Sequence, residues 1–143
     1  MNKIVTVFVL LFVFVGGFFV FYNRSRPSPE QKWETKTDDQ SLVTVAVTPI
    51  EFGAVAKLWK FNVVLTTHSG SLDQDLVQVA ELTDGQGRTY KPIAWEGAPV
   101  GGHHREGVLV FNAIAVAPTS VELKIKNIGG GPDRLFKWVK TGQ

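Results

Sequence analysis

A hydrophobic run near the N-terminus sets the first limit on how this chain folds. Residues 4–22 (IVTVFVLLFVFVGGFFVFY) carry no charge, and Thr6 is the only polar side chain before Tyr22. As a helix that rises about 1.5 Å per residue, the run spans roughly 28 Å, close to the hydrocarbon thickness of a bilayer. Apolar side chains point to all sides of such a helix, which leaves no polar face for solvent. We therefore expect a transmembrane anchor over residues 1–23 that contacts the membrane through residues 4–22.

A cleaved signal peptide is the alternative interpretation of this run. It would need a short apolar region and a cleavage site of small residues. The pair of small residues, Gly16 and Gly17, lies inside the run, which ends in Phe-Val-Phe-Tyr. A lipid-modified N-terminus would need a cysteine, and the sequence has none. The sequence therefore favours a retained single-pass signal-anchor.

The charges beside the run bear on orientation. Lys3 precedes the run, whereas Arg24 and Arg26 follow it, so the positive-inside rule is nearly balanced. A very short N-terminal tail that leads directly into a signal-anchor usually stays in the cytoplasm. We therefore expect a cell-membrane protein with its remaining residues on the extracytoplasmic side.

The composition excludes several kinds of chemistry. Without cysteine the chain has no disulfides, thiolate nucleophile, iron–sulfur cluster or blue-copper site. Three of the 15 lysine and arginine residues flank the hydrophobic run, which leaves 12 after residue 26 against 13 acidic residues. The remainder is therefore close to neutral and lacks the basic footprint of a nucleic-acid-binding domain. The glycine-rich stretches lack the pattern of a phosphate-binding loop, and no serine has nucleophile-elbow context, so we do not expect an enzyme.

The residues after the hydrophobic run divide into a polar tether and a β domain. Residues 24–41 are polar and include Pro27 and Pro29, a composition typical of linkers. Trp33 is the exception, and we expect it to dock onto the domain. The β domain is predicted to cover residues 42–143.

Within residues 42–143, short apolar or alternating runs are separated by turn residues. Val43, Val45 and Val47 share one face of the first run. Asp84-Gly85-Gln86-Gly87 is a hairpin turn sequence. About seven strands at this spacing predict an antiparallel, immunoglobulin-like β-sandwich, and a small β-barrel is the alternative. The predicted strands cover residues 42–48, closed by Pro49, and residues 55–65, 76–82, 88–93, 108–116, 121–125 and 134–140.

Two segments, residues 66–75 and residues 95–107, do not fit the short-turn pattern. Binding residues tend to lie on loops that a rigid scaffold carries. We expect Trp95 to pack at the base of the second loop, and Arg105 or a histidine to hydrogen-bond to the first loop. The candidate ligand-binding residues are Trp95, His103, His104, Arg105 and Glu106.

The same two loops carry all three histidines of the chain, which raises the alternative of a divalent metal site. Imidazole and carboxylate groups are ligands for Zn²⁺ and Cu²⁺. No spacing here is diagnostic of a metal, and the competing interpretation is that the histidines and Arg105 bind backbone carbonyls and nearby glutamates. The candidate metal ligands are His68, Asp73, Asp75, His103 and His104, and no other cofactor is expected.

Four stretches resemble a family of small membrane-anchored or exported bacterial and archaeal β domains. They are THSGSLDQDL (67–76), TYKPIAWEG (89–97), GGHHREGVLVF (101–111) and KNIGGGPDRLFKW (126–138). The resemblance covers about half of the chain, and GGHHREGVL is its most distinctive part. The family has no settled activity, so the resemblance implies a shared fold and a paired role for the two loops. We expect a binding or interaction module for an envelope protein, an envelope polymer or a small ligand.

Overall fold

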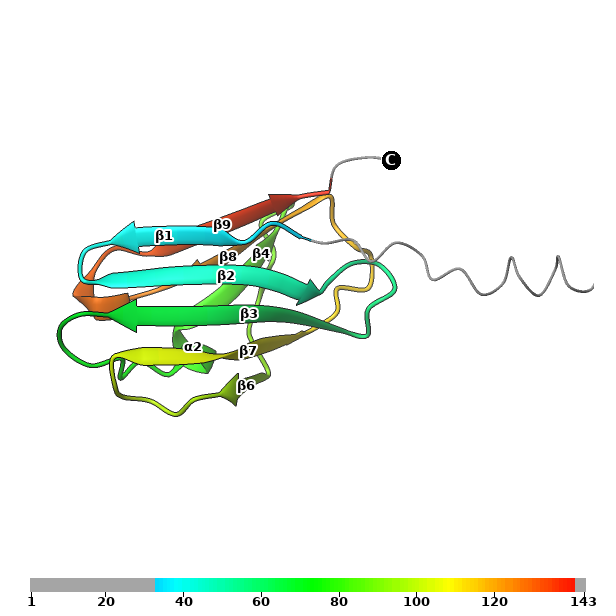
Figure 1. Ribbon diagram of the computed structural model, residues 1–143. Helices are drawn as coiled ribbons and strands as arrows, with labels where there is room; N and C mark the ends of the chain where they lie inside the picture. The colour runs from blue at the N-terminus through cyan, green and yellow to red at the C-terminus, as the bar shows by residue number, and fades with distance from the viewer. Residues whose placement is uncertain (1–32, 141–143) are drawn as a thin grey trace, which may run out of the picture. The chain divides into compact units, whose positions relative to one another are not determined.

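The computed structural model describes residues 33–140, which form two antiparallel β-sheets packed face to face (Figure 1). One sheet has five strands in the order β1-β2-β3-β7-β6, and the other has four in the order β5-β4-β8-β9. This all-β architecture confirms the predicted class, although the described residues contain nine strands rather than seven. The elements are β1 (Lys36–Gln40), β2 (Val43–Glu51), β3 (Leu58–Thr67), α2 (Leu76–Val79), β4 (Ala80–Asp84), β5 (Thr89–Tyr90), β6 (Ala94–Gly97), β7 (His104–Asn112), β8 (Ser120–Ile125), the 3-10 turn η1 (Ile128–Gly130) and β9 (Arg134–Val139).

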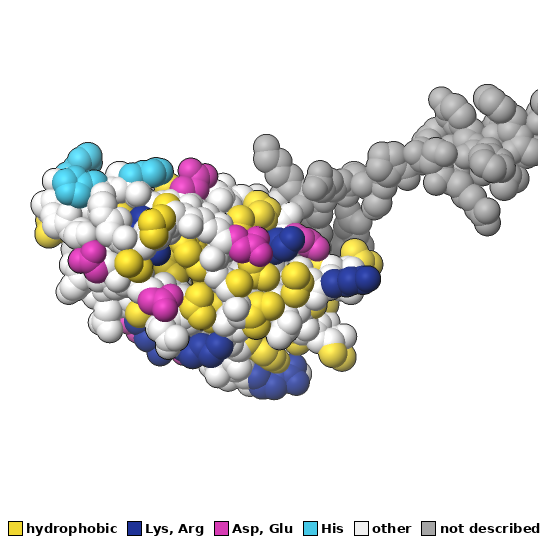
Figure 2. All heavy atoms as spheres, turned by 90° about the horizontal axis from the view of Figure 1, so that it is seen from below, with side chains coloured by type: hydrophobic (Ala, Val, Ile, Leu, Met, Phe, Trp, Pro, Cys, Tyr) yellow, Lys and Arg dark blue, Asp and Glu magenta, His cyan; other side chains and the backbone are white. Residues whose placement is uncertain are grey.

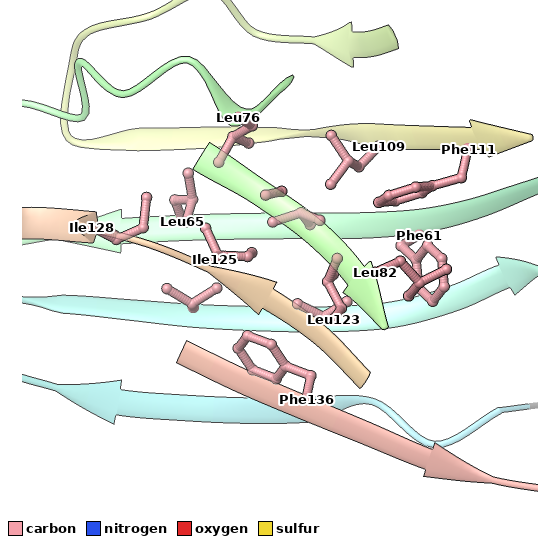
Figure 3. Close-up of a cluster of buried hydrophobic side chains, with 14 of the residues drawn as sticks. Phe61, Leu65, Leu76, Leu82, Leu109, Phe111, Leu123, Ile125, Ile128 and Phe136 are labelled. Carbon is pink, nitrogen blue, oxygen red and sulfur yellow. The ribbon is translucent and has the colours of Figure 1, made fainter. Parts of the chain in front are cut away.

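The core lies between the two sheets and is built by alternation along the strands (Figure 3). In β3 every second side chain from Trp59 to Leu65 is fully buried, because successive strand residues point to opposite faces. The facing sheet contributes Leu123 and Ile125 from β8 and Phe136 from β9. The predicted hairpin at residues 84–87 is confirmed, since β4 and β5 pair across it.

The predicted tether was wrong at its C-terminal end. Residues 36–40 form β1, which pairs with β2 from Lys36↔Val47 to Gln40↔Val43. The strand reads KTDDQ and has no apolar side chain, because it lies at the edge of the sheet and is held by backbone hydrogen bonds. The domain therefore begins before residue 42. The predicted docking of Trp33 is confirmed, since its ring meets that of Phe52 edge-on with centroids 4.7 Å apart.

Other predicted strand limits were wrong as well. The predicted strand over residues 108–116 ends at Asn112, and within residues 88–93 the strand covers Thr89–Tyr90. Leu76–Val79 is one helical turn, α2, because the Asp75 side chain caps it by accepting a hydrogen bond from the Val77 N–H at 3.0 Å. Pro49 does not close β2, which continues to Glu51 through an irregularity in its register with β3. Bulges of this kind let an edge or strand end accommodate proline.

Residues 95–107 do not form one long loop. Trp95 lies in β6, and β7 begins at His104, so the segment is a hairpin connected by residues 98–103. The hairpin was hard to predict because its strands contain Gly97 and Gly107, and glycine is depleted in strands.

The predicted anchor, residues 4–22, lies outside the described residues. Among residues 33–140, no helix is both long enough and apolar enough to cross a bilayer.

The sandwich has two distinct ends (Figure 1). Connections 68–75 and 98–103 lie at one end, which we call the histidine end. Connections 52–57 and 113–119 lie at the other end. The described chain begins and stops beside them, since Trp33 packs against Phe52 and the Lys140 N–H donates to the carbonyl of Thr119. We call this second end the terminal end.

Candidate functional site

At the histidine end the two predicted loops lie side by side. The backbone N–H of Thr67 donates to the carbonyl of His103 at 2.9 Å, and that of Leu72 donates to Gly102 at 3.0 Å. The N–H of Gly101 donates in return to the carbonyl of Leu72 at 2.9 Å. Connections 68–75 and 98–103 therefore form one backbone-bonded unit.

Arg105 holds this unit in place by hydrogen bonds from inside the sandwich. Its side chain points into the sandwich from β7, and the residue is only 2% exposed. The guanidinium Nη1 donates to the carbonyls of Leu72 at 3.1 Å and Gln74 at 2.7 Å. This contact confirms the predicted hydrogen bond from Arg105 to the first loop.

The charge of Arg105 has no carboxylate within ion-pair distance among the described residues. Burial lowers the pKa of its guanidinium, and the charges of Asp75 and Asp73 partly oppose that shift. The side chain remains protonated at neutral pH, since arginine starts from so high a pKa. Its Nε has no hydrogen-bond partner within residues 33–140, so the carbonyls and the ring of Trp95 carry its stabilisation.

Trp95 packs beside Arg105 at the base of the hairpin, as predicted. The guanidinium carbon lies 5.6 Å from the centroid of the Trp95 ring, within cation–π range. The indole N–H donates to the carbonyl of Ala98 at 2.8 Å. Gly97 and Gly107 face each other across the pair, and a Cβ on Gly107 would lie 2.7 Å from the Trp95 ring atom Cζ2. The two glycines therefore leave room for the indole to lie across the paired strands.

The remaining candidate residues lie on the surface of the histidine end. His68, His103, His104 and Glu106 are exposed, and histidine side chains gather at one end of the face seen in Figure 2. The Nδ1 atom of His104 lies 3.2 Å from the hydroxyl of Thr66, and its Nε2 lies 4.0 Å from a carboxylate oxygen of Glu106.

The carboxylates proposed as metal ligands both have local hydrogen bonds. Asp75 caps α2, and Asp73 accepts a hydrogen bond from the Ser71 hydroxyl at 2.7 Å. Within residues 33–140, no group of three or more histidine and acidic side chains is close enough to hold a metal ion. The metal hypothesis therefore has no complete ligand set within the described residues.

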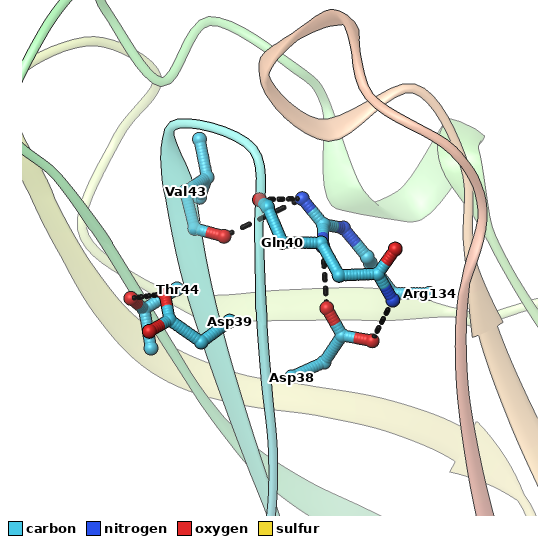
Figure 4. A network of polar contacts seen from close by, with 6 residues as sticks. All are labelled: Asp38, Asp39, Gln40, Val43, Thr44 and Arg134. Atoms are coloured by element: carbon cyan, nitrogen blue, oxygen red, sulfur yellow. Dashed lines mark hydrogen bonds and ion pairs between the residues drawn. The ribbon is translucent and has the colours of Figure 1, made fainter.

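Sequence reasoning missed a second buried arginine. Arg134 is fully buried at the start of β9 and forms an ion pair with Asp38 of β1 (Figure 4). Its Nη2 also donates to the carbonyls of Gln40 and Val43. Arg134, Phe136 and Trp138 alternate with exposed residues, so all three lie on the inner face of β9. The sequence alternation therefore already indicated that Arg134 is buried.

Asp84, at the β4–β5 turn, is a second buried polar residue that the sequence did not single out. Burial raises the pKa of its carboxyl group, but hydrogen bonds outweigh that effect and lower the pKa from 3.8 to about 2. The donors are the Arg88 side chain and N–H, the Gln86 N–H and the Tyr90 hydroxyl. The arrangement braces a turn and offers no open catalytic group.

Comparisons with known proteins identify no family for this chain. No protein family and no curated protein matches the chain. Among solved structures, a DUF4426 family protein from Pseudomonas aeruginosa is similar, with 11% identity and a TM-score of 0.42 over 73% of this chain and 90% of that one.

Proposed function

We propose that this protein is a membrane-anchored binding module that presents its histidine end to a partner in the cell envelope, either a protein or a polymer. One observation supports this most: the buried Arg105 fastens connections 68–75 and 98–103 into a single surface. A preorganised surface loses little conformational entropy when a partner binds. The histidine end also lies opposite the end at which residue 33 enters the domain (Figure 1).

The proposed topology is a single crossing by residues 4–22, with the β domain on the extracytoplasmic side. The uncharged run supports the crossing. A protease added to intact cells or spheroplasts should digest the domain. Digestion only after lysis would invert the orientation.

Photo-cross-linking in intact cells tests the binding surface. A photoreactive residue at position 103 should give a defined adduct with an envelope protein or polymer. The same residue at Lys137, an exposed position on the outer face of β9, serves as the control. The same adducts from both positions, or none from position 103, would count against binding at the histidine end.

We also infer an immunoglobulin-like topology. Without the outer strand β1, the sheets read β2-β3-β7-β6 and β5-β4-β8-β9. Lettered in chain order from β2, with β5 as C′, this corresponds to A-B-E-D facing C′-C-F-G, the order of immunoglobulin domains. Loops at one end of such sandwiches commonly form binding surfaces.

The alternative is a divalent metal site. Its support is the hydrogen bond between Thr67 and His103, which brings the segment that carries His68 beside the second loop. Metal analysis of the purified protein, with a His103→Ala/His104→Ala control, tests it. Bound Zn²⁺ or Cu²⁺ that the double substitution removes would favour the alternative, and metal-free protein would reject it.

A further inference from the structure

Two loops at the terminal end are apolar along almost their whole length. They read FGAVAK over residues 52–57 and AIAVAPT over residues 113–119, with Lys57 as the one charge. Each exposes an Ala-Val pair at its tip, and Val55 is 99% exposed and Val116 79% exposed. Pairing of Leu58 with Asn112 brings the two loops together, because it joins the start of β3 to the end of β7. We call Val55, Val116 and their flanking alanines the valine tips.

The first valine tip is held in its exposed position by aromatic residues that are buried or half-buried. The indole N–H of Trp59, a fully buried residue, donates to the carbonyl of Gly53 at 3.0 Å. The ring of Phe52 packs edge-on against both Trp33 and Trp59, with centroids 4.7 and 4.6 Å apart. The start of the loop is therefore fixed to the core while its tip projects outward.

The second tip has the same construction. Ala113, Ile114 and Ala117 pack against the core, whereas Val116 between them does not. Thr119 accepts a backbone hydrogen bond from Lys140 at 2.8 Å, which fixes the end of this loop beside β9. Loops usually carry polar side chains at such tips, so two adjacent apolar tips point to an apolar environment.

The sequence limits what can lie next to this end of the domain. Residues 23–32 are all that separate the uncharged run from Trp33. Ten residues reach at most about 35 Å when fully extended and about 18 Å on average as a flexible coil. With the anchor in the bilayer, the terminal end is thus confined to the neighbourhood of the lipid surface.

We propose that the valine tips rest in the interfacial region of the bilayer that holds the anchor, so that the domain stands on the membrane by its terminal end. This inference depends on the proposed membrane anchoring. Lys57 and Lys140 are exposed beside the tips and favour anionic headgroups. The tether keeps the tips at an effective concentration on the order of millimolar, so even a weak contact remains formed.

The size of the tips favours lipid over a second copy of the chain. A stable protein interface buries roughly 800 Å² on each partner and centres on large aromatic or arginine side chains. The valine tips offer two small side chains on separate protrusions. Apolar tips of that size match shallow insertion among headgroups, which requires no complementary shape.

Environment-sensitive fluorophores on single cysteines test the proposal in the full chain. The chain has no native cysteine, so Val55→Cys and Val116→Cys can each be labelled at one position. Val100→Cys is a matched control, since Val100 is a valine of the histidine end that is 57% exposed. The labelled proteins are reconstituted into vesicles of phosphatidylethanolamine and phosphatidylglycerol and recovered by flotation.

Probes at positions 55 and 116 should show blue-shifted emission, loss of quenching by aqueous iodide and strong quenching by lipids that carry a shallow nitroxide. The probe at position 100 should stay fully open to iodide. If the chain floats with the vesicles while iodide quenches all three probes fully, the proposed tip contact is wrong and the proposed anchor is supported. If the probes at positions 55 and 116 are shielded from iodide but are not quenched by the nitroxide lipid, another protein surface covers the tips. That result would also overturn the proposal. Failure of the chain to float would overturn the anchor and the tip contact together.

Discussion

Replacement of Arg105 by alanine removes the side chain that fastens the histidine end. The substitution leaves the carbonyls of Leu72 and Gln74 without their donor, and Leu72 itself is 1% exposed. It also leaves a void beside Trp95. We therefore expect Arg105→Ala to destabilise the fold and to loosen connection 68–75 first.

Two opposing effects set the magnitude. A hydrogen bond from a charged donor contributes about 1.5–3 kcal/mol, and two carbonyls accept one here. Against this, Arg105→Ala relieves the burial of a charge that has no ion-pair partner within residues 33–140. The net loss in the free energy of unfolding should be about 1–3 kcal/mol, the range for stranded buried polar groups.

Urea unfolding of residues 27–143, followed by tryptophan fluorescence, measures this loss. Lys137→Ala is the control, because an exposed side chain of this kind should change stability by no more than about 0.5 kcal/mol. Amide exchange gives a local readout, since the N–H groups of Leu72 and Gly101 bond across the two loops. If Arg105→Ala unfolds like the wild type and both amides remain protected, the arginine does not hold the loops.

Three further changes test other parts of the structure. Asp38→Ala should cost about 3–5 kcal/mol in urea unfolding because it leaves the buried charge of Arg134 without its partner, whereas the exposed neighbour change Asp39→Ala should cost about 0.5 kcal/mol or less. Asp84 has its pKa lowered from 3.8 to about 2, so its contribution to stability is present above pH 3.8 and is lost as the pH falls toward 2; an acid titration should show Asp84→Asn lacking that part of the decline. Gly107→Ala should cost about 1–3 kcal/mol and shift the tryptophan emission, since the new Cβ would lie 2.5 Å from the Cα of Gly97; wild-type stability would refute the close packing of β6 on β7.

Alternation of apolar residues was enough to predict most of the core. Val43, Val45 and Val47 are buried on one face as expected, and Trp59 begins a similar series in β3. Alternation of apolar and polar residues is a reliable sign of a β-strand when one face of the strand is buried and the other is not. The two-sheet architecture follows from several such strands with short turns.

The elements that the sequence concealed lack this pattern for identifiable reasons. Strand β1 (Lys36–Gln40) is an edge strand with polar side chains, so burial leaves no trace in its composition. The turn α2 (Leu76–Val79) is too short to show a helical period, although Asp75 is a helix-capping residue. In the β6–β7 hairpin, the glycines that admit Trp95 are also residues that usually break strands.

The location of the candidate site and a hydrogen bond from Arg105 or a histidine to the first loop were predictable from the sequence, but the burial of Arg105 was not. The length and composition of residues 66–75 and 95–107 indicated where exposed polar groups would gather. That Arg105 is buried could not be read from the sequence, because arginine is rarely buried without a partner. Only the fold shows that the carbonyls of Leu72 and Gln74 point at it.

Different kinds of side chain cover the core at the two ends of the sandwich, and this difference bears on the proposed orientation of the domain at the membrane. At the histidine end, two buried arginines bind loop carbonyls, Arg105 under connection 68–75 and Arg134 at the β1–β2 turn. At the terminal end, Trp33, Phe52 and Trp59 close the core with aromatic rings. Guanidinium groups can satisfy many carbonyls and so permit irregular polar loops above them, whereas aromatic packing suits loops with few polar groups to satisfy. A sandwich built with a polar cap at one end and an apolar cap at the other is matched to two different surroundings, which agrees with the proposed partner at the first end and the proposed bilayer contact at the second.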